Sequence, residues 1–298
     1  MNTRAFSCLM AALFGLFPAA APAAEVTLPY RALTLNANLE LAGGKSIKDG
    51  MILIVHGTLA HNGMEMISYL QSVLKEKGRS SLAINLSYGV SNRHGMYECG
   101  KTHAHLDTDA LGEIAAWKAW LGREGVKEVT LLGHSRGGTQ VARYLAERDD
   151  PLVRNGILMA PDTRDEASTA QSYQKRFGKP LADTLGRAQA LVKEGKGDSV
   201  MKDVDILYCE KTSASAASFV SYHGPDPWRD ASALLPKLKK PVLLVAAGAD
   251  ELVPNVEKKS APHVDGKKVQ MKVIKGADHF FRDLYTDEAV ETIIAFVK

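Results

Sequence analysis

The chain alternates between short, continuously apolar runs and longer stretches whose apolar residues recur every three or four positions. The short runs are rich in Val, Ile and Leu and lie at residues 51–57, 81–89, 128–135, 156–161, 241–248 and 269–276. The longer stretches lie at residues 61–77, 106–123, 137–147 and 287–297. Short apolar runs are typical of buried parallel strands, and the wider spacing is typical of helices. The order predicts an α/β fold with a mainly parallel, doubly wound sheet covered by helices on both faces.

Two segments depart from this regular order. Residues 26–41 alternate between polar and apolar side chains, which predicts an N-terminal hairpin or pair of strands. Residues 162–235 form a long irregular section that is charged and helical at first and then rich in small and aromatic residues. We therefore expect one core, made of residues 25–161 and 236–298, interrupted by an insertion over residues 162–235.

The N-terminus has the pattern of a Sec-type signal peptide. Arg4 precedes the apolar run CLMAALFGLF, and Ala21 and Ala23 fit the A-x-A rule for a cleavage site. The run is shorter than the roughly 20 residues that a membrane-spanning helix needs. We predict a cleaved signal peptide over residues 1–24, no stable membrane anchor, and a periplasmic or secreted mature protein.

The composition is that of an ordinary globular protein and excludes some functions. The 298 residues are 45% hydrophobic and 24% charged, and the formal net charge is +3. Basic residues are scattered among acidic ones, so the chain has no patch typical of nucleic-acid binding. The oligomeric state cannot be deduced from the sequence.

Removal of the signal peptide would leave two of the three cysteines, Cys99 and Cys209. An even pair in an oxidising compartment indicates a possible disulfide. Two separate buried thiols are the alternative, because the sequence does not give the distance between them.

Three chemically suggestive side chains directly follow apolar runs, where parallel strands end and ligands bind in such sheets. Ser135 follows VTLLGH, Asp250 follows VLLVAAGA, and His279 follows MKVIKGAD. Ser135 lies in a G-x-S-x-G motif, GHSRG, between a predicted strand and a predicted helix. With the acid loop GADELVP, the histidine loop GADHFF and an upstream HGT, the mature chain resembles the α/β-hydrolase superfamily over nearly its whole length.

The resemblance implies a Ser-His-Asp triad. A serine hydroxyl is a poor nucleophile at neutral pH, so it needs a neighbouring base, and the base needs an acid that fixes its tautomer. Ser135 is the expected nucleophile, His279 the base and Asp250 the acid. Asp162 is the second candidate acid, because some members place the acid after an earlier strand. His134, next to the serine, is expected to pack away from it.

The same resemblance implies an oxyanion hole made of backbone N–H groups. The N–H of Arg136, directly after the serine at a helix start, is expected to be one donor. The N–H of Thr58 in HGT is expected to be the other, with that of Leu59 as the alternative.

Members of the superfamily carry a cap that buries the substrate at the position that residues 162–235 occupy in this chain, so the resemblance implies that this insertion is a cap. Phe219, Tyr222 and Trp228 are candidates for lining the pocket, although core packing is the commoner role of such residues. The loop at residues 91–105 is expected to overhang the site. Its histidines and cysteine match no common zinc spacing, so we expect no metal.

The sequence therefore predicts an exported serine hydrolase that cleaves carboxylic esters or thioesters of small molecules through an acyl-enzyme, without a cofactor. A peptidase or a lactonase would use the same triad. The alternative from another class is a non-catalytic binding or accessory protein that keeps the fold alone.

Overall fold

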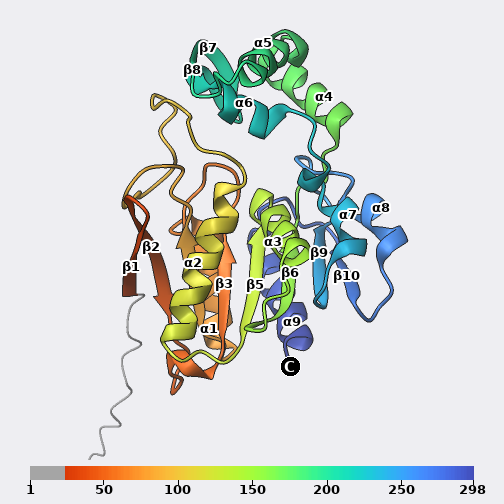
Figure 1. The fold of residues 1–298 in the computed structure, drawn as a ribbon. Coiled ribbons are helices and arrows are strands. Elements are labelled where there is room, and N and C mark those ends of the chain that lie inside the picture. Colours follow the sequence, from red (N-terminus) through yellow and green to blue (C-terminus); the bar gives the residue numbers. More distant parts are fainter. Residues whose placement is uncertain (1–23) are drawn as a thin grey trace, which may run out of the picture.

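The computed structural model describes residues 24–298, so the predicted signal peptide lies outside the described residues apart from Ala24. An eight-stranded sheet forms the centre of the molecule (Figure 1). In spatial order its strands are β1 (Ala24–Tyr30), β2 (Leu33–Glu40), β4 (Ser81–Asn85), β3 (Met51–Val55), β5 (Val129–His134), β6 (Val153–Met159), β9 (Val242–Ala247) and β10 (Val269–Ile274). β2 pairs antiparallel with both β1 and β4, and every other pair of neighbouring strands in this sheet is parallel. The predicted mainly parallel sheet is confirmed.

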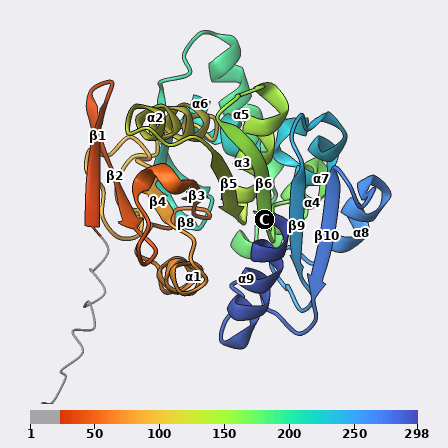
Figure 2. The ribbon, with the colours of Figure 1, turned by 90° about the horizontal axis from the view of Figure 1, so that it is seen from below.

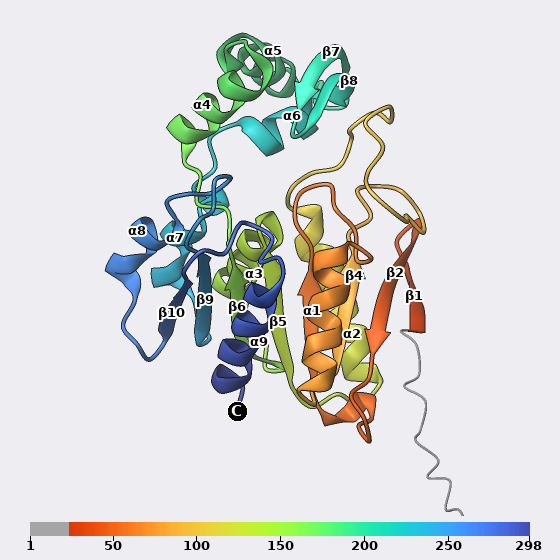
Figure 3. The same cartoon turned by 180° about the vertical axis from the view of Figure 1, so that it is seen from behind.

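Helices cover both faces of the sheet. The helices α2 (Asp109–Arg123) and α3 (Arg136–Glu147) lie on one face, and α1 (Glu65–Glu76) and α9 (Leu284–Phe296) lie on the other (Figures 2 and 3). Two buried apolar clusters separate the helices from the sheet, one on each face. Strands such as β3 are buried at every position because side chains on both faces pack against helices.

A second layer lies above the carboxyl ends of the strands (Figures 1 and 3). It consists of α4 (Glu166–Phe177), α5 (Leu181–Lys193), β7 (Val200–Ile206), β8 (Cys209–Ser215) and α6 (Ala216–His223). Beyond it the chain returns to the core through α7 (Ala231–Leu234), and α8 (Val256–Ser260) precedes β10. Short 3₁₀ helices lie at Ile47–Asp49, Pro227–Arg229, Leu235–Lys237 and Ala261–His263.

The antiparallel hairpin of β7 and β8 is absent from our prediction. Its pairing is irregular, with register shifts between Met201 and Val204 and between Val204 and Ile206. Each irregularity breaks the two-residue alternation by which a strand is found in a sequence.

The loop at residues 91–105 is tied to this upper layer. Cys99 and Cys209 form the predicted disulfide, with their Cα atoms 5.2 Å apart. The N–H of His103 donates to the carbonyl oxygen of Ser213, and the N–H of Ser215 donates back to that of His103, each over 2.8 Å. The loop therefore joins the core to β8 covalently and through the backbone.

Within residues 24–298, helices are too short or too polar to cross a membrane.

Candidate active site

Ser135 lies on a sharp turn between β5 and α3. Its backbone has φ 56° and ψ −126°, a conformation that non-glycine residues rarely adopt. A Cβ atom at Gly133 would overlap with the carbonyl group of Gly137, and one at Gly137 would overlap with the carbonyl oxygen of His56. Only glycine fits at these two positions, and the close packing holds Ser135 at the carboxyl end of the sheet.

Ser135, His279 and Asp250 form a continuous chain of hydrogen bonds. The Nε2 atom of His279 lies 2.9 Å from Oγ of Ser135, and its Nδ1 atom lies 2.7 Å from Oδ2 of Asp250. All three side chains are buried. Asp250 follows β9 and His279 follows β10, so adjacent parallel strands bring the two loops together. A base with a fixed tautomer and a hydroxyl within reach is able to activate a nucleophile.

Asp250 is held in its ionised form. Its Oδ1 atom accepts N–H bonds from Leu252 and Val253, each at 2.8 Å. Burial alone would raise the pKa of Asp250, but the hydrogen bond from His279 and the two backbone donors lower it below its ordinary value.

The carboxylate of the second candidate acid has a different partner. Asp162 binds the side chain of Arg164 through both carboxylate oxygens, at 2.8 and 2.6 Å. Asp278, the sequence neighbour of His279, pairs with Arg282 instead. Of the three carboxylates, only Asp250 contacts His279.

The two neighbouring histidines have structural contacts. His134 makes a 2.8 Å hydrogen bond with the backbone carbonyl of His279. The ring of His56 donates from Nδ1 to the carbonyl oxygen of Gly57 and accepts the N–H of Leu86 at Nε2. Burial lowers the pKa of both rings to about 3, so both are neutral. His56 thereby holds the HGT loop in place.

The HGT loop lies against the serine. A Cβ atom at Gly57 would lie 3.1 Å from Cβ of Ser135. In the part of the chain that the structure describes, the N–H groups of Thr58 and Arg136 have no hydrogen-bond acceptor, whereas the N–H of Leu59 donates to the hydroxyl of Tyr88. Two unpaired donors beside a serine hydroxyl are suited to an oxyanion.

The side chain of Arg136 is a feature that our sequence analysis missed, because only its backbone was considered. Its Nε atom donates to Oγ1 of Thr58 over 3.0 Å, and Nη1 lies 3.2 Å from the carboxylate of Asp107. Nη2 lies 3.8 Å from Asp162. Burial alone would lower the pKa of Arg136, but Asp107 and Asp162 raise it above its ordinary value.

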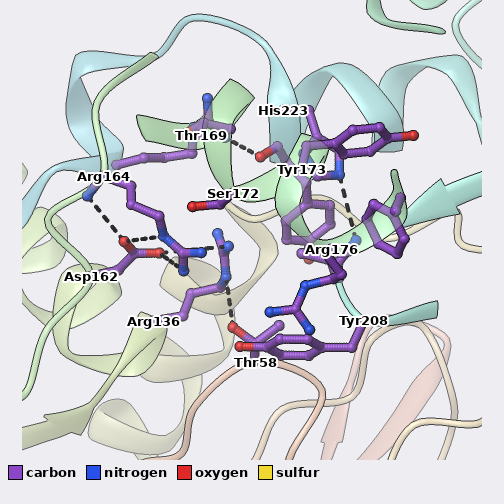
Figure 4. Close-up of a pocket in the computed structure, with 14 residues that line it drawn as sticks. Thr58, Arg136, Asp162, Arg164, Thr169, Ser172, Tyr173, Arg176, Tyr208 and His223 are labelled. Carbon is purple, nitrogen blue, oxygen red and sulfur yellow. Dashed lines mark hydrogen bonds and ion pairs between the residues drawn. The ribbon is translucent and has the colours of Figure 1, made fainter. Parts of the chain in front are cut away.

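A pocket opens between this site and the upper layer (Figure 4). Thr58 and Arg136 line it from the core, and Tyr222 of α6 lines it from above. The other two candidate lining residues are placed differently. Phe219 is fully buried against Tyr173 and His223, and Trp228 is half-buried between Arg143 and Lys237.

No group of three or more His, Cys, Asp or Glu side chains in residues 24–298 is placed to hold a metal ion. In the loop at residues 91–105, Cys99 is in the disulfide, and His105 binds the hydroxyl of Tyr222 through Nδ1 at 2.7 Å. His94 pairs with Glu25 on the surface.

The fold and this site define a hydrolase of the α/β class. The chain belongs to the Alpha/beta hydrolase family, whose sequence pattern matches residues 52–293.

Solved structures of two esterases and a lipase have a similar fold. Est1E from Butyrivibrio proteoclasticus is 19% identical over 92% of this chain and 97% of its own, with a TM-score of 0.64. The monoacylglycerol lipase of Paleococcus ferrophilus is 20% identical over 88% and 97%, with a TM-score of 0.59. The Pyrococcus furiosus esterase Pf2001 is 17% identical over 92% and 91%, with a TM-score of 0.58.

Proposed function

We propose that this protein is an exported serine hydrolase that cleaves carboxylic esters or thioesters through an acyl-enzyme. The observation that carries the proposal is the buried chain of hydrogen bonds from Ser135 through His279 to Asp250. The similarity of the fold to an esterase and a monoacylglycerol lipase supports the same reaction class.

In this mechanism, Oγ of Ser135 attacks the acyl carbonyl and its proton passes to Nε2 of His279. Asp250 accepts the Nδ1–H bond, which keeps Nε2 free as the base and stabilises the imidazolium. The oxyanion receives hydrogen bonds from the N–H groups of Thr58 and Arg136. His279 then protonates the departing alcohol or thiol. A water molecule repeats the sequence on the acyl-enzyme, which releases the acid and restores the serine hydroxyl.

The insertion at residues 162–235 is proposed to act as the cap over this site. The position of α4 to α6 above the strand ends and the pocket beneath them support this role. A cap excludes water from the acyl-enzyme and selects the substrate.

Export is part of the proposal. The signal-peptide pattern before Ala24 supports it, and so does the disulfide, because such bonds persist mainly in oxidising compartments.

A fluorophosphonate probe tests the proposal directly. We expect the folded protein to be labelled at Ser135 and the Ser135→Ala variant to remain unlabelled. With p-nitrophenyl butyrate, and with a matching thioester, kcat of the variant is expected to fall by about 10⁴-fold or more. Equal rates, or no labelling of the folded wild type, would favour the non-catalytic accessory protein. Faster turnover of peptides or lactones than of esters would move the assignment to a peptidase or a lactonase.

A further inference from the structure

The pocket lined by Thr58 and Arg136 contains four arginines. The cavity itself is small, about 50 Å³, and it is partly open to solvent. Arg136 and Arg164 line it from the core side, Arg176 from α4, and Arg229 from the segment that follows α6. Asp162 is the one carboxylate that lines it, and Asp107 lies behind Arg136.

Two of the four arginines are neutralised by these carboxylates. Asp107 pairs with Arg136, and Asp162 pairs with Arg164 and more distantly with Arg136. Figure 4 shows the guanidinium groups of Arg136 and Arg164 turned toward Asp162. These paired groups form one wall of the pocket, and among the described residues the other two arginines have no ion pair with a carboxylate.

Arg229 is buried without a directly paired carboxylate, and Asp107, Asp226 and Asp162 act on its charge only from a longer distance. Its side chain is 8% exposed, and within residues 24–298 it forms no ion pair with a carboxylate. Its Nη1 atom donates to the carbonyl oxygen of Tyr222, while its buried Nε has no partner among those residues. Burial lowers the pKa of Arg229, which reflects the free-energy cost of keeping this charge away from water. A fold retains such a group at a cost of several kcal/mol unless an anion balances it.

Arg176 adds a second positive charge without an ion pair in residues 24–298 at the opening. It is exposed, its guanidinium lies 4.2 Å from the ring centre of Tyr208, and within the described residues no carboxylate pairs with it. Figure 4 shows Arg176 and Tyr208 at one side of the pocket. Aromatic walls of Tyr173, Tyr208 and Tyr222 reduce the local polarity, which strengthens the attraction for an anion.

We propose that this pocket is a carboxylate subsite, and that the substrate is an ester or thioester that itself carries a carboxylate group. The inference rests on the proposed function, because Thr58 and Arg136 belong both to the pocket and to the proposed oxyanion hole. A substrate would then place its ester carbonyl in the proposed oxyanion hole and its carboxylate in the pocket. Guanidinium groups bind planar carboxylates through paired N–H bonds, and the charge left after internal pairing is positive.

Matched substrate pairs test the subsite. The p-nitrophenyl monoester of glutaric acid carries a carboxylate on the acyl side, and its methyl ester is the neutral partner. The acetate ester of 3-hydroxybenzoate carries one on the leaving group, again with its methyl ester as partner. For the wild type we expect kcat/KM to be at least about tenfold higher for the charged member of one pair, since a hydrogen bond between two charged groups is stronger than one between neutral groups.

Variants then locate the preference. Arg176→Gln and Arg229→Gln are expected to lower the ratio of charged to neutral kcat/KM by about tenfold each. Arg187→Gln is the matched control. Arg187 is exposed on α5 and does not line the pocket, so this substitution removes the same charge from the same layer at a position away from the pocket. Arg176 is exposed, so its variant gives an answer even if Arg229→Gln does not fold.

The inference is overturned if neutral esters react as fast as charged ones, or if Arg187→Gln changes the ratio as much as Arg176→Gln does. Binding separates this outcome from failure of the proposed function. If no ester is cleaved, titration of the Ser135→Ala protein with glutarate by calorimetry still tests the subsite, with weaker binding expected in Ser135→Ala/Arg176→Gln. Tighter binding of a phosphate monoester such as phenyl phosphate than of glutarate would overturn the assignment to carboxylates.

Discussion

The ring of His134 donates its Nε2–H to the backbone carbonyl of His279 over 2.8 Å. The carbonyl oxygen accepts only, and burial lowers the pKa of His134 to about 3, so the ring is neutral and carries its proton on Nε2. The two ring centres lie 4.9 Å apart. The residue that precedes the proposed nucleophile therefore fixes the loop that supplies the proposed base.

Removal of this donor should misplace His279. We expect His134→Leu to lower kcat on p-nitrophenyl butyrate by about 10- to 100-fold with little change in KM, because a small shift of a catalytic group is costly. His134→Gln, whose side-chain N–H groups reach a similar position, should recover part of the rate. Steady-state kinetics of the three proteins give the comparison, and equal kcat values for His134→Leu and wild type would contradict it.

The two candidate acids should respond differently to the same change. Asp250→Asn removes the acceptor that fixes the tautomer of His279, so we expect kcat to fall by about 10⁴-fold with the fold intact. Asp162→Asn leaves Arg164 and Arg136 short of a counter-charge, so its main effect should be a loss of about 3 kcal/mol in the free energy of unfolding. Ester kinetics and urea denaturation of both variants separate the roles. A larger loss of kcat in Asp162→Asn than in Asp250→Asn would make Asp162 the acid of the triad.

Most of the fold was predictable because its signals are local. Apolar runs mark the parallel strands, and the rule that ligands bind at strand ends predicts Ser135, Asp250 and His279 as site residues from the sequence. The hairpin of β7 and β8 was not predicted, because its irregular register interrupts the alternation of polar and apolar side chains that indicates a strand.

The arginine pocket was not predictable for a different reason. Arg229 and Arg136 are 93 positions apart in the sequence, and only the folded chain brings both to one cavity. The aromatic residues that were candidates for lining the pocket were also not predictable in full. Tyr222 lines the pocket, while Phe219, three residues earlier on the same helix, packs inside the upper layer. Composition indicates an aromatic segment, but the direction of each side chain depends on tertiary contacts.

Glu113 should make stability depend on pH. Burial raises the pKa of Glu113 to about 7. The hydrogen bonds that its carboxylate accepts from Ser87 lower the pKa, but by less than burial raises it. The folded state therefore binds more protons than the unfolded state between pH 4.5 and 7, and this group makes stability fall as pH rises through that range. Glu113→Gln keeps the shape without the charge. Relative to wild type, its free energy of unfolding should increase by up to about 3 kcal/mol from pH 4.5 to pH 8.

Urea denaturation at four pH values between 4.5 and 8 measures the effect. A difference between Glu113→Gln and wild type that stays constant across those values would contradict the assignment.

The disulfide should contribute to stability through the upper layer. Cys99 and Cys209 are 110 residues apart, so their bond restricts a long loop of the unfolded chain. We expect Cys99→Ser/Cys209→Ser to lose about 3 kcal/mol in the free energy of unfolding. Wild type treated with a reductant should unfold like the double variant. Unfolding at the same urea concentration in all samples would show that the bond is energetically neutral.

The closed ring from Cys99 to Cys209 has a consequence for how the chain withstands proteolysis. Ser135 lies inside the ring, whereas Asp250 and His279 lie beyond it. A protease that cuts an exposed turn of the upper layer between α4 and α5 would leave both fragments attached to one another. The nicked protein would run as two bands only after reduction, and the three side chains would stay on one covalently linked molecule.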